Sequence, residues 1–292
     1  MLGAIAGDVI GSVYEFNNTR DYNFRLFSEE SEFTDDTIMT IAIANWLLKD
    51  PNHSYQGLED SMLLFAKRYK YPKGAYGTGF FIWLFHPEKC YPFNEIYGKL
   101  PYKSLTGRHP YGSKGNGSAM RVSPVGWFFD SLEETERVAE ISARITHNHP
   151  DGIAGAKATA GAIWLARNGK TKDEIFKYII NNYPYSFHHP LSFYSGKWFS
   201  DCEGTVPAAI FCFLESTNYY DAIRRAVSLG GDSDTLACIT GSIAEAFYKR
   251  MTPYIVGQTI KRLDKPLLDV LNEFARRTEY GKIYNEYDIP TE

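Results

Sequence analysis

Residues 2–15 read LGAIAGDVIGSVYE, a stretch in which apolar and small residues both recur at helical spacing. The apolar side chains form one helix face through the spacing i, i+3, i+4, i+7, i+8 and i+11: Leu2, Ile5, Ala6, Val9, Ile10 and Val13. Gly3, Gly7 and Gly11 form an adjacent stripe, where the missing side chains would let another backbone approach closely. The stretch therefore predicts a helix packed tightly against a second element.

Helical periodicity continues through most of the chain, in residues 37–48, 132–146, 153–167, 219–229 and 235–250. The first of these is apolar on nearly every face, as in a helix buried inside a sizeable domain. Alternating strand patterns bounded by turns are nearly absent. Irregular structure is expected at 69–118 and 183–204, and loops this long are usually functional. The sequence predicts an all-α fold, a single compact multi-helix domain over residues 1–292.

Composition excludes several classes of protein. The 292 residues carry a net charge of -4, which gives no basic patch for nucleic acid. Asp8 interrupts the first apolar run too early for a signal peptide. The longest apolar stretch, residues 38–48, is about half the length of a membrane span. The four cysteines form no CxxC pair, which favours reduced thiols. We expect a cytoplasmic monomer that does not associate with membranes.

Two acidic clusters stand at predicted helix starts, TDDT at 34–37 and GGDSDT at 230–235. Helix capping is one explanation, because Asp, Ser and Thr accept bonds from free backbone N–H groups. Capping needs one acceptor, however, and crowded carboxylates repel unless protons or cations neutralise them. Hard oxygen ligands without His or Cys favour Mg²⁺ or Mn²⁺. The candidate metal ligands are Thr34, Asp35, Asp36, Asp232, Asp234 and Thr235.

Glu15 is a further acidic candidate. It lies seven residues after Asp8, with Ser12 between them, so these three polar groups are expected on one face of the first helix. The Glu15 side chain is expected either on a solvated helix face or beside the metal ions.

Taken together, the motifs resemble those of the ADP-ribosylglycohydrolase family. GAIAGDVIGSVYE, FTDDT, GNGSAMR, THNHP and GGDSDT occur in the family's order and cover most of the chain. The resemblance implies an all-α fold and a centre of two Mg²⁺ or Mn²⁺ ions. It also implies substrates in which ADP-ribose is attached to a protein side chain or another acceptor.

The resemblance also implies a role for each motif. Residues 34–36 would bind one metal, Asp232 and Thr235 the second, and Asp234 would bridge both. Glu15 resembles the family's acidic residue near the metals. The candidate catalytic residues are Glu15, Asp35 and Asp36.

Residues 115–118 form a glycine-rich segment before an apolar run. An ordinary turn is one explanation, but small residues at a helix start also expose N–H groups that can hold a diphosphate. With the family resemblance, the candidate substrate contacts become Gly115, Asn116, Gly117, Ser118 and His147. Arg121 is expected either at the diphosphate or in a surface or structural ion pair.

The function implied is hydrolysis of the glycosidic bond between ADP-ribose and its acceptor. One alternative is a two-metal phosphoester or pyrophosphate hydrolase, which could use the same clusters. Another is a non-catalytic relative that binds ADP-ribose, which would be expected to lose metal ligands. All six cluster positions hold oxygen side chains here.

Overall fold

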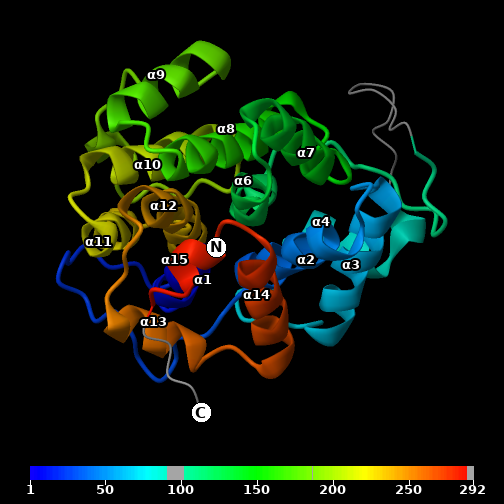
Figure 1. Cartoon of the computed structure of the whole chain (residues 1–292), viewed down its shortest axis with the longest axis horizontal. Helices are drawn as coiled ribbons and strands as arrows, with labels where there is room; N and C mark the ends of the chain where they lie inside the picture. Colours follow the sequence, from blue (N-terminus) through cyan, green and yellow to red (C-terminus); the bar gives the residue numbers. More distant parts are fainter. Residues whose placement is uncertain (91–101, 186, 288–292) are drawn as a thin grey trace.

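The computed structural model describes residues 1–90, 102–185 and 187–287, and within these ranges it is helical with two isolated β-bridges and no longer strand. The all-α prediction is confirmed (Figure 1). The helices are α1 (Leu2–Gly11), α2 (Asp35–Lys49), α3 (Tyr55–Arg68), α4 (Thr78–Phe85), η1 (Pro87–Lys89), α5 (Gly117–Met120), α6 (Ser123–Phe128), α7 (Leu132–Arg144), α8 (Pro150–Arg167), α9 (Lys172–Asn182), η2 (Leu191–Phe193), α10 (Cys202–Glu215), α11 (Tyr219–Leu229), α12 (Ser233–Tyr248), α13 (Pro253–Ile260), α14 (Lys265–Arg277) and α15 (Gly281–Tyr284).

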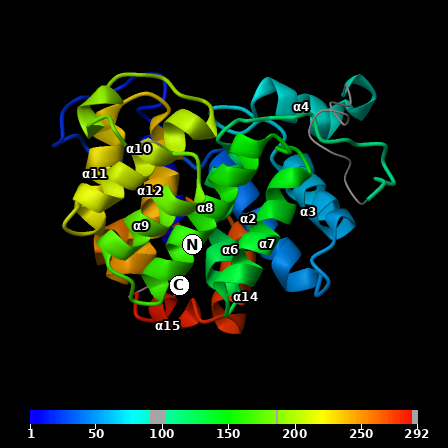
Figure 2. The ribbon, with the colours of Figure 1, turned by 90° about the horizontal axis from the view of Figure 1, so that it is seen from above.

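Helices α1 and α12 form the centre of the molecule, and every residue of α1 is buried. Helices α8, α10 and α11 pack around α12 on one side, while α2, α3 and α4 lie on the other (Figures 1 and 2). The site described below lies where these two groups of helices meet.

The glycine stripe of α1 is the surface that packs against α12. A Cβ on Gly7 would overlap the carbonyl oxygen of Ala237, and one on Gly11 would lie 2.5 Å from the Cα of Asp234. Gly3 faces Gly241 in the same way, so the two helices run antiparallel with their backbones in contact. This packing sets the end of α1 against the start of α12.

The helix boundaries differ from the sequence prediction by a few residues at several places. Helix α1 ends at Gly11, before Val13. Helix α2 starts at Asp35 because the Thr34 side chain caps it by accepting a bond from the Asp36 N–H. Helix α12 ends at Tyr248, since Lys249 adopts a left-handed conformation (φ 55°).

The first predicted irregular region, 69–118, contains α4 and two shorter helical turns. Its residues 91–101 lie outside the described residues. The second, 183–204, is irregular apart from η2 and the first turn of α10 in the part that the structure describes. Among the described helices, none is both long enough and apolar enough to cross a bilayer.

The contact between α1 and α12 can be tested with one methyl group. Gly7→Ala would place that methyl against the backbone of α12, so we expect it to lower the free energy of unfolding by about 1–3 kcal/mol. Urea denaturation followed by circular dichroism measures this. The control is Gly257→Ala in α13, where a Cβ meets nothing within 4 Å and alanine should stabilise the helix by up to about 1 kcal/mol. Equal effects of the two substitutions would contradict the packing described here.

Candidate metal centre

Asp8 is the residue of α1 that fixes the start of α2. Its carboxylate accepts bonds from the Thr34 N–H (3.0 Å) and the Thr34 hydroxyl (2.8 Å), and from both the N–H and the hydroxyl of Thr37. Burial raises the pKa of Asp8 to about 6, although the hydrogen bonds act to lower it. The first acidic cluster is thus attached to the helix that contacts the second one.

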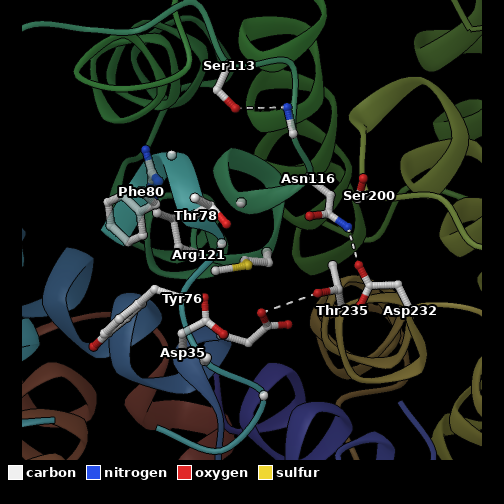
Figure 3. A pocket seen from close by; sticks show the side chains of 18 of the residues that line it. Asp35, Tyr76, Thr78, Phe80, Ser113, Asn116, Arg121, Ser200, Asp232 and Thr235 are labelled. Atoms are coloured by element: carbon white, nitrogen blue, oxygen red, sulfur yellow. Dashed lines mark hydrogen bonds between the residues drawn. The ribbon is translucent and has the colours of Figure 1, made fainter. Parts of the chain in front are cut away.

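The two acidic clusters meet in space. The Thr235 hydroxyl lies 3.3 Å from the Asp36 Oδ1, although 199 residues separate them. Glu15, Asp232 and Asp234 each offer a carboxylate oxygen, and these atoms lie within 4.8 Å of one another. Figure 3 shows both clusters facing the same space.

Helix capping accounts for only one member of these clusters. Thr34 is buried, accepts the Asp36 N–H (3.2 Å) and donates to Asp8, and it does not line the pocket. Asp232 stands at the N-cap position of α12, yet its side chain makes no capping bond. The carboxylates of the two clusters therefore require another explanation.

Electrostatics supply that explanation. Burial and the charge of Asp234 raise the pKa of Asp36 well above its usual range, and burial raises the pKa of Asp232 to about 6. The Oε2 of Glu15 and the Oδ2 of Asp36 are buried without a hydrogen-bond partner. Buried oxygens of this kind cost free energy unless something binds them. A divalent cation with oxygen ligands would satisfy both the charge and the unpaired atoms.

Glu15 reaches the cluster from a bend beyond the end of α1. Burial, followed by the charge of Asp234, raises its pKa to about 8. The backbone turns at Gly74 with φ 76°, where a Cβ would lie 2.8 Å from the Glu15 Oε2. Ser12 does not share this position, because its hydroxyl donates to the Val9 carbonyl (3.1 Å). The expectation that Ser12 and Glu15 extend one helical face is wrong, since the helix ends between Asp8 and Glu15.

Asn18 holds the Glu15 bend against the second cluster. Its amide nitrogen donates to the carbonyls of Glu15 (2.8 Å) and Gly231 (3.0 Å), and its amide oxygen accepts the Gly231 N–H (2.6 Å). Gly231 adopts φ 82°, a conformation that favours glycine. The local sequence gives no signal for Asn18, because its bonds to Gly231 join segments 213 residues apart.

The acidic cluster opens into a pocket of about 530 Å³. Its opposite wall contains Gly115, Asn116, Gly117 and His147. The Asn116 amide nitrogen donates to the Asp232 Oδ2 (2.7 Å), so this side chain orients a cluster carboxylate (Figure 3). The Ser118 hydroxyl is buried, donates to the Gly152 carbonyl (2.7 Å) and does not line the pocket.

His147 lies beside the two glycines with its Nδ1 within 2.7 Å of the Thr146 hydroxyl. A Cβ on Gly117 would lie 3.2 Å from the His147 Nε2. Burial, and then the charge of Arg121, lowers the pKa of His147 well below its usual range, so the imidazole is neutral at pH 7. The pocket wall is therefore glycine backbone beside an uncharged ring.

Arg121 is buried and lines the pocket, which excludes a surface ion pair. It donates to the Ser142 carbonyl (2.7 Å) and lies 5.9 Å from the Phe80 ring centre. Burial lowers its pKa to about 10, which still leaves it cationic at pH 7. By contrast, burial raises the pKa of Cys202 to about 12, so its thiol is protonated at pH 7.

Comparisons with known proteins agree on one family. Residues 1–279 match the family described as ADP-ribosylglycohydrolase. The chain is 29% identical to ADP-ribosylhydrolase ARH3 of Homo sapiens, with 85% of this chain and 84% of that protein covered. It is 25% identical to an ADP-ribosylarginine hydrolase of Pseudomonas putida, over 92% of this chain and 76% of that protein. A solved structure titled ADP-ribosylglycohydrolase-related protein complex shares the fold, with a TM-score of 0.65, 20% identity and coverage of 94% and 96% of the two chains.

The raised carboxyl pKa values lead to a pH dependence of stability. Without divalent cations, the folded chain holds protons that the unfolded chain releases, because the Asp232 and Glu15 pKa values rise from 3.8 and 4.5 to about 6 and about 8. The free energy of unfolding should therefore fall as pH rises from about 4 to about 8. Added Mg²⁺ should reduce this fall, since it stabilises the ionised carboxylates.

Urea titrations at pH 5, pH 6 and pH 8, in EDTA and in Mg²⁺, measure the difference. The Glu15→Gln variant should show a smaller fall between pH 6 and pH 8 in EDTA. The same pH dependence with and without Mg²⁺ would contradict a cation site.

Proposed function

The chain belongs to the ADP-ribosylglycohydrolase family, and on that premise we propose that it hydrolyses the bond between ADP-ribose and an acceptor group by means of two divalent cations. The observation that carries the proposal is the convergence of Glu15, Asp35, Asp36, Asp232 and Asp234 on one pocket. Two of these side chains have buried oxygens without partners. A pocket of about 530 Å³ also matches the usual size of a small-molecule site.

The proposed ions are Mg²⁺ or Mn²⁺, because the donors are carboxylate and hydroxyl oxygens. Asp35 and Asp36 would hold one ion, Asp232 and Thr235 the other, and Asp234 both. Thr34 could contribute only the lone pair that remains beside its bonds to Asp8 and to the Asp36 N–H. When bound, the ions would fix the ribose hydroxyls and lower the pKa of a water molecule.

The reaction adds water to the anomeric carbon of the ribose next to the acceptor. The water oxygen forms the new bond, the bond from that carbon to the acceptor breaks, and the acceptor leaves with the electron pair and a proton. The transition state is cation-like at the sugar, so nearby carboxylates stabilise it. Glu15 is the proposed proton carrier, because its Oε2 is buried, unpartnered and on the pocket wall.

The diphosphate is proposed to lie along residues 115–118. Gly115 and Gly117 expose backbone there, and the neutral His147 ring fills the space behind them. Arg121 provides positive charge on the same pocket wall. Asn116 has a positioning role through Asp232, and Ser118 could contribute its backbone N–H.

The test is to follow product release from ADP-ribose linked to arginine, to serine and to nucleic acid, with and without EDTA. Intact ADP-ribose, released only with Mg²⁺ or Mn²⁺, supports the proposal. Release of AMP would indicate pyrophosphate hydrolysis, and binding without turnover would indicate a non-catalytic relative.

Asp234→Asn should reduce turnover by a larger factor than Asp35→Asn, because Asp234 interacts with carboxylates of both clusters. Its carboxylate groups with those of Glu15 and Asp232, and its charge raises the pKa values of Asp35 and Asp36. Steady-state rates at saturating Mg²⁺ measure the effect. Stability in EDTA should stay equal or increase, since the substitution removes a repelling charge. Equal, small losses of activity in the two variants would contradict the bridging role.

Glu15→Gln should lower turnover by about 10²-fold or more, the usual scale for a positioned acid–base group. Calorimetric binding of free ADP-ribose should change little, since the fold and the glycine wall remain. The matched control is Glu32→Gln, an exposed carboxylate on the following loop, which should leave the rate within about twofold. Turnover near the wild-type rate in Glu15→Gln would assign the proton transfer to Asp35 or Asp36.

A further inference from the structure

Two exposed aromatic residues stack on each other at the acidic end of the pocket. The rings of Phe16 and Trp198 lie 5.7 Å apart with planes at 15°, and the side chains are 74% and 48% exposed. Trp198 lines the pocket, and Phe16 directly follows Glu15 in the chain. Large exposed apolar groups beside a pocket are typical of recognition sites.

We propose that Trp198, supported by Phe16, binds the acceptor that carries ADP-ribose, and that it selects the guanidinium group of an arginine side chain. This inference rests on the function proposed above. Trp198 would touch the substrate, whereas Phe16 would position the indole.

The position of Trp198 along the pocket supports this role. A Cβ on Gly231 would overlap the Lys197 carbonyl and lie 3.5 Å from the Trp198 Cα, so Trp198 adjoins the turn that precedes Asp232. Two residues later the chain has reached the glycine wall, where the Ser200 carbonyl accepts the Asn116 N–H (3.0 Å). Trp198 therefore lies at the end of the pocket where the proposed metal ligands lie. The scissile bond would lie at this end, and the acceptor would extend beyond it.

The stacked pair also has a rigid base. Asn18 joins the Phe16 bend to Gly231, as described above, and the Arg20 guanidinium donates to the Leu229 carbonyl (2.6 Å) and the Ser195 hydroxyl (2.7 Å). The Gly196 N–H donates to the same Leu229 carbonyl (2.9 Å). Three segments far apart in the sequence therefore hold the two rings in place before a substrate arrives, which reduces the entropy lost on binding.

Charge favours a cationic acceptor here. Carboxylates adjoin this aromatic pair, because Glu15 directly precedes Phe16 in the chain and Asp232 follows the turn that Trp198 adjoins. The face of an indole ring attracts cations, and the planar guanidinium stacks on it. The neighbouring ammonium of Lys197 lies over the Phe193 ring. A serine acceptor has neither a positive charge nor a planar group that could stack on the indole ring.

The experiment compares kcat/KM for arginine-linked, serine-linked and nucleic-acid-linked ADP-ribose in the wild type and in Trp198→Ala. We expect the wild type to prefer the arginine linkage. Trp198→Ala should lower kcat/KM for that linkage by about tenfold, mainly through KM, and for serine by less than about twofold. Calorimetric affinity for free ADP-ribose should not change.

Phe16→Ala should give a smaller loss of about threefold through KM, and Phe16→Tyr should restore the wild-type value, because a tyrosine ring can stack in the same way. Tyr254→Ala is the control for loss of an exposed aromatic, since Tyr254 is 56% exposed on α13 and does not line the pocket. It should behave as the wild type.

Each other outcome overturns the inference in a distinguishable way. Equal losses for all linkages, or weaker binding of free ADP-ribose, would place Trp198 in the ADP-ribose subsite. A wild-type preference for serine or nucleic acid would exclude selection of a guanidinium. Failure of the wild type to release ADP-ribose from any linkage would instead refute the proposed function, and this inference with it.

Discussion

The contact between the backbones of α1 and α12 is the constraint on which the rest of the structure depends. It is possible because glycines replace side chains at every fourth position of α1, and Gly11 accepts a bond from the Ser233 hydroxyl (3.1 Å) at the far end. The contact places the end of one helix against the start of the other. Asp8, in the middle of α1, binds the residue that caps α2. The contact between α1 and α12 therefore brings three helix ends together around a single space.

The assembled space is unfavourable in electrostatic terms when no cation is present. Five carboxylates are crowded at one pocket, and their pKa values rise because burial and mutual repulsion penalise the ionised forms. A fold selected only for stability would not retain such a cluster. The surrounding structure compensates with close helix packing and with neutral partners such as Asn116, which orients Asp232 without cancelling its charge.

Local sequence patterns were sufficient for the helices and for the two clusters, because periodicity and TDDT or GGDSDT are properties of short segments. They were insufficient wherever a residue acts across the fold. The sequence places Asp8 on a polar face with Ser12 and Glu15, but it gives no sign of the Asp8 bonds to the start of α2, which depend on how α1 meets α2. Asn18 and Trp198 carry no local signature at all, since their roles arise only where segments from distant parts of the chain meet.

The pairing of the first and the twelfth helix also has a consequence for synthesis on the ribosome. Gly11 and Ser233 are separated by 222 residues, so α1 emerges long before the surface that covers it. During that interval an apolar, glycine-striped helix has no native neighbour on its principal face, and exposed segments of this kind are prone to aggregation. Its protection by chaperones would then matter more than the speed of any local step, because the long-range closure is intrinsically slow. The same separation means that nascent chains lacking α12 cannot assemble the acidic centre, so any activity would arise only after α12 has been synthesised.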